Sequence, residues 1–206
     1  LKALDSYLSY DGIESPMTIY KDIYELPAAN YMIISENNIY QNKYWDLNNI
    51  NNTEKSFDYY KSHLKELILD STKKRMISDV PLGIFLSGGI DSSIIAGVAS
   101  KNLSNRIKTY SMKGGENEFN ELPFAAKVAK FNNSIHNEFS NDEFNLSKTL
   151  SNLTDAFDQP FSDSSMIPTY YVSKFASEHV KVALSGEGGD ELFGGYERYK
   201  NLITIN

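Results

Sequence analysis

The residues best suited to chemistry lie in one short stretch, residues 84–93. An apolar run opens it, and its polar and glycine members are Ser87, Gly88, Gly89, Asp91, Ser92 and Ser93. Two adjacent glycines let the backbone turn sharply and approach a ligand with no β-carbon in the way. The first turn of a helix has unpaired N–H groups and a partial positive charge, which attract phosphate. The order of strand, glycine loop and helix start therefore predicts a phosphate-binding loop.

Asp91 is the candidate metal ligand of this loop. An aspartate beside a phosphate repels it unless a divalent cation lies between them and is bound by both, so we expect Asp91 to bind Mg²⁺. The alternative is that Asp91 and Ser92 only cap the helix and that Gly88-Gly89 is only a tight turn. The loop is not a Walker A motif, because no Gly-Lys-Ser/Thr sequence follows it.

A second glycine-rich block, residues 185–196, follows the last predicted strand. Ligands of open α/β sheets lie beyond the carboxyl ends of the strands, so both blocks could surround one ligand. We interpret Asp190 as the second protein ligand of the Mg²⁺ held by Asp91. The alternative is that Asp190 caps the next helix and that Glu187 is a solvent-facing loop residue. The block fails the dinucleotide fingerprint, because Glu191 stands where its last glycine is needed.

Strands and helices must alternate to position these blocks. An apolar run predicts a strand over residues 84–86, and we interpret residues 106–112, 134–139 and 180–184 as three further strands. Apolar residues three and four apart predict helices over residues 56–76, 116–131 with Pro123 in the first turn, 142–155 and 164–177, and a further helix that begins at Asp91. Parallel neighbouring strands need crossover helices. We therefore expect an α/β fold with a mostly parallel sheet and helices on both faces.

Residues 1–49 differ from the rest, because they are rich in Tyr, Ile and Asn and show no long helical period. Residues 31–34 and 39–42 flank a polar turn and predict a small β-hairpin. Its aromatic residues pack either against a neighbouring unit or only within the hairpin. A polar linker over residues 48–55 then divides the chain into residues 1–49 and 50–206.

Composition excludes several classes of protein. The 206 residues carry a net charge of -7, which argues against a non-specific nucleic-acid surface. No cysteine is present, so disulfides, thiolate zinc sites and a cysteine nucleophile are excluded from this segment. No apolar run approaches the roughly 18 to 20 residues that span a membrane, and we expect a cytoplasmic protein. The chain begins with Leu1 rather than Met and is expected to be a piece of a longer protein.

The pair SGGIDSS and SGEGGDELFGGY resembles the synthetase domain of glutamine-hydrolysing asparagine synthetases, a member of the N-type ATP pyrophosphatase (PP-loop) class. Residues 16–20, 44–47 and 118–125 also resemble that family, so the likeness covers nearly the whole chain. It implies an adenine nucleotide alpha hydrolase-like fold. Residues 1–49 would then be the tail of an N-terminal glutaminase domain and its junction, and residues 50–206 the first part of the synthetase domain.

The resemblance implies a reaction in two steps. ATP adenylates the side-chain carboxylate of aspartate with release of pyrophosphate, and ammonia from glutamine then displaces AMP to give asparagine. It assigns Glu187 to adenylate formation, beside Asp91 and Asp190, with Mg²⁺ as cofactor. ATP would be contacted by Phe85 and Met112 through the backbone beside the adenine, and by Ser87, Gly88, Gly89, Asp91, Ser92, Ser185 and Gly186. Tyr196 lies in the same block without an assigned role.

Departures from the family leave alternatives open. The family's terminal cysteine is absent, and so are the helices with a catalytic lysine that follow the second block, so we expect no glutamine-dependent synthesis from this segment alone. The acceptor could be another carboxylate, as in surface-sugar amidation or peptide or lactam cyclisation, with a pocket that includes residues 158–165. A tRNA-modifying enzyme or a non-catalytic nucleotide-binding module are further alternatives, and a homodimer is one arrangement that the resemblance allows.

Overall fold

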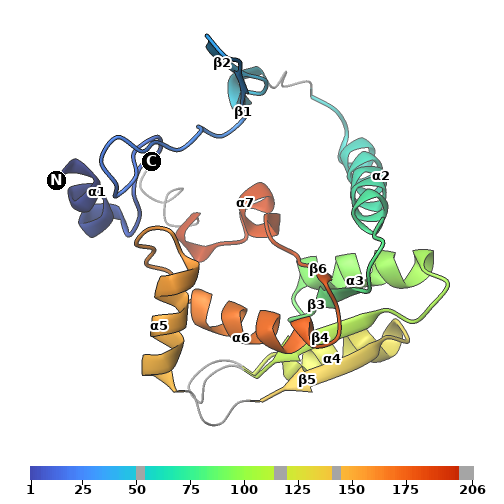
Figure 1. The fold of residues 1–206 in the computed structure, drawn as a ribbon. Helices are drawn as coiled ribbons and strands as arrows, with labels where there is room; N and C mark the ends of the chain where they lie inside the picture. The colour runs from blue at the N-terminus through green and yellow to red at the C-terminus, as the bar shows by residue number, and fades with distance from the viewer. Residues whose placement is uncertain (50–53, 114–119, 141–144, 200–206) are drawn as a thin grey trace. The chain divides into compact units, whose positions relative to one another are not determined.

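The chain forms two compact units in a computed structural model that describes residues 1–49, 54–113, 120–140 and 145–199 (Figure 1). One unit contains residues 1–56 and 145–166, and the other contains residues 57–144 and 167–206. Residues 145–166, which the sequence analysis places in the second domain, therefore group by their contacts with the N-terminal residues. Among the described helices, none combines the length and the apolar character needed to cross a membrane.

The second unit is built on a parallel sheet with the strand order β5-β4-β3-β6. Its strands are β3 (Leu82–Phe85), β4 (Lys108–Met112), β5 (Ile135–Phe139) and β6 (Val182–Leu184). The predicted parallel sheet is confirmed. Because β3 lies between β4 and β6, the direction in which strands are added reverses at the boundary between β3 and β6.

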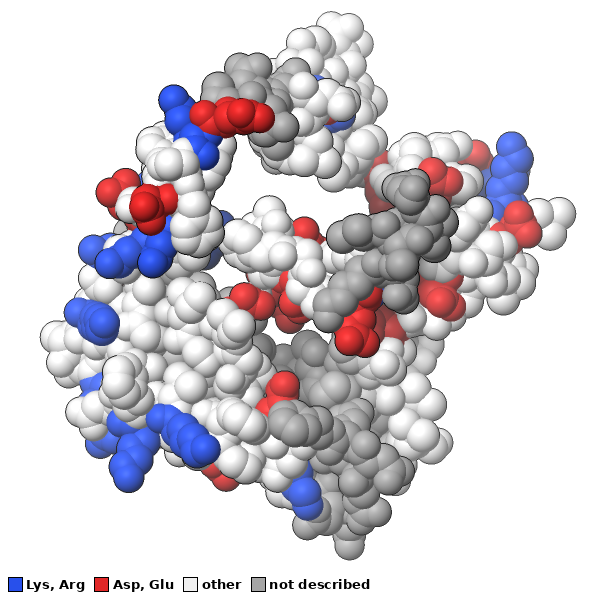
Figure 2. Space-filling model, turned by 180° about the vertical axis from the view of Figure 1, so that it is seen from behind, with Lys and Arg blue, Asp and Glu red and all other residues white. Residues whose placement is uncertain are grey.

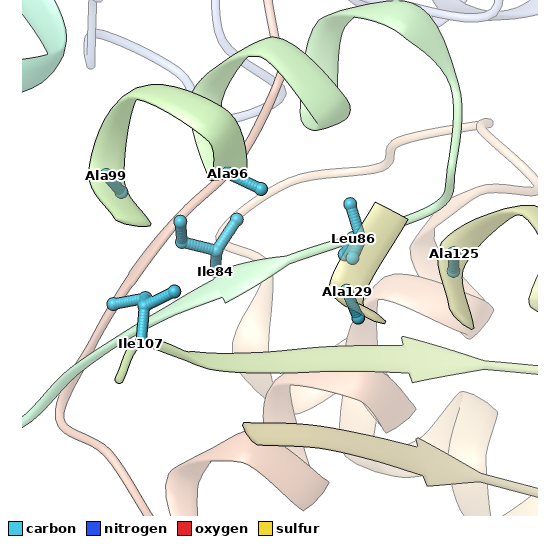
Figure 3. Close-up of a cluster of buried hydrophobic side chains, with 7 residues drawn as sticks. All are labelled: Ile84, Leu86, Ala96, Ala99, Ile107, Ala125 and Ala129. Atoms are coloured by element: carbon cyan, nitrogen blue, oxygen red, sulfur yellow. The ribbon is translucent and has the colours of Figure 1, made fainter. Parts of the chain in front are cut away.

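Helices cover both faces of this sheet, as predicted. The helices of this unit are α2 (Phe57–Arg75), α3 (Ile90–Asn102), α4 (Leu122–Phe131), α6 (Met166–Ser177) and α7 (Gly189–Phe193), and of these α3, α4 and α6 pack on the sheet. Successive side chains of a strand point to opposite faces. Ile84 and Leu86 pack on one face against alanines of α3 and α4, whose small side chains let the helices lie close to the sheet (Figure 3). Phe85 packs on the other face with Tyr110 and residues of α6.

Two helices begin later than predicted. The helix expected over residues 116–131 begins at Leu122, with Asn120 and Glu121 before it, while residues 116–119 lie outside the described residues. Pro123 does lie in its first turn. The helix expected over residues 142–155 is α5 (Leu146–Ala156), which follows Asn145. Residues 142–144 also lie outside the described part.

The first unit contains the predicted hairpin, formed by β1 (Asn30–Ile34) and β2 (Ile39–Lys43). It also contains the short helix α1 (Lys2–Tyr10), which the sequence analysis did not predict. The N-cap position of α1 is Leu1, which provides no capping side chain, so the usual start signal is missing. The buried Ser6 instead connects this helix to the segment that follows it, since its Oγ donates a hydrogen bond to the Gly12 carbonyl at 3.1 Å. The unit also contains α5 and the 3₁₀ turn η1 (Leu47–Asn49).

Candidate functional site

Both glycine blocks leave the same edge of the sheet. β3 ends two residues before Ser87, and β6 ends immediately before Ser185. Ile84 pairs with Leu184 in parallel register, so the two blocks follow neighbouring strand ends. The β3/β6 boundary is also where the strand order reverses, and open α/β sheets leave a ligand crevice at such a point.

Hydroxyl groups fix the shape of the first loop. Ser87 Oγ accepts the Gly89 N–H at 3.2 Å and lies 3.0 Å from Ser92 Oγ. The buried Ser92 also donates to the Gly89 carbonyl at 3.3 Å. Gly89 occupies the N-cap position of α3, which places Asp91 and Ser92 inside the first turn. The interpretation of these two residues as helix caps is therefore wrong.

Gly88 brings a second helix to the loop. Its φ is 90°, a conformation that favours glycine. A β-carbon at this position would lie 2.5 Å from Ala125 N and 2.8 Å from the Phe124 carbonyl carbon. The first turn of α4 thus packs directly against the loop. The sequence analysis predicted this helix and placed Pro123 in its first turn, but it did not predict that the helix contacts the loop.

The second block packs on the first turn of α3. A β-carbon on Gly186 would lie 2.8 Å from Ser92 N and 3.0 Å from Asp91 Cβ. A β-carbon on Gly189 would lie 2.6 Å from Asp91 Oδ2. Only glycine leaves room for these approaches. The structure therefore brings the two blocks together, with the Asp91 carboxyl beside Gly189, the neighbour of Asp190.

The remaining residues of the second block are more exposed. Glu187 is exposed, and its backbone N–H donates to Ser185 Oγ at 3.3 Å. Asp190 is also exposed and lies in the first turn of α7. The N-cap position of that helix is Gly188, so the interpretation of Asp190 as the cap is wrong.

Tyr196 and Glu191 form a hydrogen bond that the sequence did not reveal. The Tyr196 hydroxyl donates to Glu191 Oε1 at 2.6 Å. This bond raises the pKa of Tyr196 to about 12, because ionisation would remove the hydroxyl proton that Tyr196 donates to the Glu191 carboxylate. The same bond lowers the pKa of Glu191. The acceptor is therefore ionised and the donor protonated at neutral pH.

Phe85 and Met112 are the last residues of the neighbouring strands β3 and β4. The pairing of these strands continues into the loop, because the Leu86 N–H donates to the Tyr110 carbonyl at 2.8 Å. Their backbones thus lie at the same sheet edge as the glycine loop. The expected adenine contacts of Phe85 and Met112 stay a prediction.

The donor set fits a divalent cation shared with phosphate. Carboxylates beside a phosphate-binding loop repel the phosphate unless a cation intervenes. Mg²⁺ typically binds one or two protein carboxylates together with phosphate oxygens and water. Asp91 and Asp190 could supply the two carboxylates. Within the described ranges, no three His, Asp or Glu side chains gather to hold a metal without other ligands. On the face drawn in Figure 2, Lys and Arg form separate patches divided by uncharged and acidic surface.

The loop over residues 158–165 lies in the first unit, beside a cavity of about 780 Å³. Gln159 connects this loop to the N-terminal residues that line the cavity. Its side-chain nitrogen donates to Glu25 Oε1 at 2.7 Å, and its side-chain oxygen accepts the Ile19 N–H at 3.3 Å. Asp163 accepts the Ser165 N–H at 2.8 Å, which lowers the pKa of its carboxyl. The helix predicted from residue 164 begins just after, at Met166. The role of this loop in an acceptor pocket stays a prediction.

The chain resembles known proteins over almost its whole length. The family model described as asparagine synthase matches residues 63–205. A putative glutamine-hydrolyzing asparagine synthetase 2 of Methanocaldococcus jannaschii is 35% identical over 206 residues, covering 97% of this chain and 39% of that protein. The glutamine-hydrolyzing asparagine synthetase 1 of Bacillus subtilis is 35% identical over 207 residues, covering 99% of this chain and 32% of that protein. The chain thus spans between 32% and 39% of the length of these relatives.

One solved structure with a local likeness is the NMN synthetase from Francisella tularensis. It has a TM-score of 0.42 and 19% sequence identity, and the match covers 69% of this chain and 59% of that chain. This likeness is too slight to support a conclusion about function.

Proposed function

The chain belongs to the asparagine synthase family, and from this membership we propose that the protein that contains it is an ATP-dependent ligase that makes asparagine. ATP adenylates the side-chain carboxylate of aspartate and pyrophosphate leaves. Ammonia released from glutamine then attacks the acyl carbon, and AMP is the second leaving group. The observation that supports this proposal best is the approach of Gly189 to Asp91, which joins the second block to the phosphate-binding loop.

Each site residue has a proposed role in adenylation. The backbone N–H groups of Gly88, Gly89 and the first turn of α3 bind the pyrophosphate, whose negative charge grows as the bond to the α-phosphorus breaks. Donors that are already oriented stabilise this charge without reorganisation, and the hydroxyl pair of Ser87 and Ser92 keeps them so. Ser185 and Gly186 contact the nucleotide, and the backbones of Phe85 and Met112 bind the adenine.

The proposed roles of the carboxylates differ. Asp91 and Asp190 would hold Mg²⁺, which when bound supplies positive charge at the leaving phosphate oxygens. Glu187 acts in forming the adenylate, and the bond from its N–H to Ser185 Oγ holds its loop. The aspartate substrate, the ammonia from glutamine, a homodimer and the cytoplasmic location stay predictions.

The test is ATP–pyrophosphate exchange by the full-length protein with different carboxylic acids. We expect aspartate to stimulate exchange more than glutamate or other carboxylates. Asp91→Asn should greatly reduce exchange, whereas Asp79→Asn, an exposed aspartate between α2 and β3, should leave it unchanged. Stimulation by another carboxylate would indicate a related amidotransferase or cyclase, and no exchange with any carboxylate would contradict adenylation.

A further inference from the structure

The second glycine block carries a helix that is too short to be stable by itself. α7 has five residues, none of them buried. It is bounded by Gly188 and Gly194, whose φ values are 88° and 68°. Isolated helices shorter than about 12 residues are marginal in water, so contacts at both ends must fix the position of α7.

The contacts at the start of α7 are those of Gly186 and Gly189 with α3. At its end, the Gly195 N–H donates to the Asp190 carbonyl at 2.9 Å, as in many helix C-termini. The Tyr196 hydroxyl then reaches back across the turn to Glu191 Oε1 at 2.6 Å. The Arg198 guanidinium carbon lies 4.4 Å from the centre of the Tyr196 ring and packs on its face.

This turn holds the backbone of Gly195 against the Asp190 side chain. A β-carbon on Gly195 would lie 2.8 Å from Asp190 Cγ and 3.1 Å from its Cα. The hydrogen bond from Tyr196 to Glu191 joins the residue after Gly195 to the residue after Asp190. This hydrogen bond therefore holds the Gly195 backbone in place, and that backbone limits the positions that the Asp190 carboxylate can take.

We propose that Glu191 is a positioning residue that, through its hydrogen bond with Tyr196, fixes the turn of residues 190–196 and holds the Asp190 carboxylate in place for the phosphate site. The inference rests on the proposed function in one respect, namely the role of Asp190 toward bound Mg²⁺. A hydrogen bond to an ionised carboxylate is stronger than one between neutral groups, which suits it to close a short turn.

The first test needs no ligand. In the full-length protein without metal or nucleotide, Glu191→Ala and Tyr196→Phe should each speed amide hydrogen exchange of residues 189–196 by about threefold or more. The double variant should be no faster than either single variant, because all three lack the same bond. Glu191→Gln should have a smaller effect, since its side-chain oxygen still accepts the hydroxyl proton. Glu178→Ala, at an exposed carboxylate after α6, is the matched control.

The second test measures the Mg²⁺ concentration that gives half-maximal ATP–pyrophosphate exchange. We expect it to rise about three- to tenfold in Glu191→Ala and Tyr196→Phe, with partial recovery in Glu191→Gln. Unchanged amide exchange, fully additive effects, or an unchanged Mg²⁺ requirement would each overturn the positioning role. A wild-type protein that lacks aspartate-stimulated exchange would instead contradict the proposed function, while the ligand-free amide exchange would still test whether the bond fixes the turn.

Discussion

A β-carbon at position 189 would take the space that the Asp91 carboxyl group now occupies. In Gly189→Ala the new methyl group would lie 2.6 Å from Asp91 Oδ2. The carboxyl group can rotate aside, so we expect a loss of only about 0.5–1.5 kcal/mol in the free energy of unfolding. Mg²⁺-dependent ATP binding should weaken much more, because the displaced group is the proposed metal ligand. Calorimetric titration with ATP and Mg²⁺ together with thermal unfolding would separate the two effects.

Gly12→Ala provides the matched control for this substitution. No atom lies within 4 Å of a β-carbon at position 12, so both stability and ATP binding should stay near the wild-type values. Equal ATP affinities for Gly189→Ala and Gly12→Ala would show that the Asp91 carboxylate does not take part in nucleotide binding.

Gly88 differs from Gly189 because its neighbours are backbone atoms. In Gly88→Ala the new methyl group meets Ala125 N at 2.5 Å, and a φ of 90° adds strain. Backbone atoms of α4 cannot rotate aside as a carboxyl group can. We expect a loss of about 1–3 kcal/mol in the free energy of unfolding, together with weaker ATP binding. Chemical denaturation would measure the loss, and a change smaller than that of Gly189→Ala would contradict the packing of loop against helix.

At the scale of the element, α3 contains a glycine, Gly97, that its proposed role in phosphate binding does not require. A β-carbon on Gly97 would lie 3.7 Å from Asn132 Oδ1, an ordinary contact distance. Glycine in a helix interior is less favourable than alanine by roughly 0.5–1 kcal/mol. Gly97→Ala should therefore raise the free energy of unfolding by about that amount without changing ATP binding. A decrease measured by chemical denaturation would show that α3 has no room for the methyl group.

The order of the elements was predictable because each carries its own local signal. The apolar run at residues 84–86 identified β3, and Pro123 correctly marked the first turn of α4. The predicted starts at residues 116 and 142 were too early, since polar residues before a helix resemble its exposed face. α1 was missed because Leu1 provides no capping group at its start. That β3 and β6 are neighbours could be seen only in the structure, because almost 100 residues separate these strands in the sequence.

The candidate site shows the same division between local and long-range information. The types of Ser87, Gly88 and Asp91 predict a loop between a strand and a helix, which the structure shows, and its binding of phosphate stays a prediction. The contacts of Gly88 with α4 and of Gly186 with α3 depend on how distant segments pack, and nothing in a local motif reports them. The bond between Tyr196 and Glu191 depends on the turn at Gly194, whose left-handed conformation the sequence does not state.

The stability of the second unit as a whole should depend on the protonation of His136. Its Nδ1 lies 2.9 Å from Thr109 Oγ1, and burial lowers the pKa of the imidazole despite the opposing effect of Glu138. The unfolded chain therefore takes up a proton near pH 6.5, whereas the folded chain does so only at lower pH. The free energy of unfolding should fall as the pH drops below about 6.5, and this loss is complete once the pH passes below the lowered pKa.

His136→Gln removes the titrating ring and keeps a side chain that can bond to Thr109. Thermal unfolding of wild type and variant at pH 7.5 and pH 5.5 measures the contribution of His136. The midpoint of the wild type should fall more between the two pH values than that of the variant, because only the wild type must keep a partly buried imidazole neutral. Carboxylates remote from position 136 affect both proteins equally, and comparing the two in a Glu138→Gln background removes the effect of Glu138, whose Oε1 lies 3.3 Å from His136 Nε2. Equal shifts would therefore show that the pKa of His136 is the same in the folded and unfolded chains.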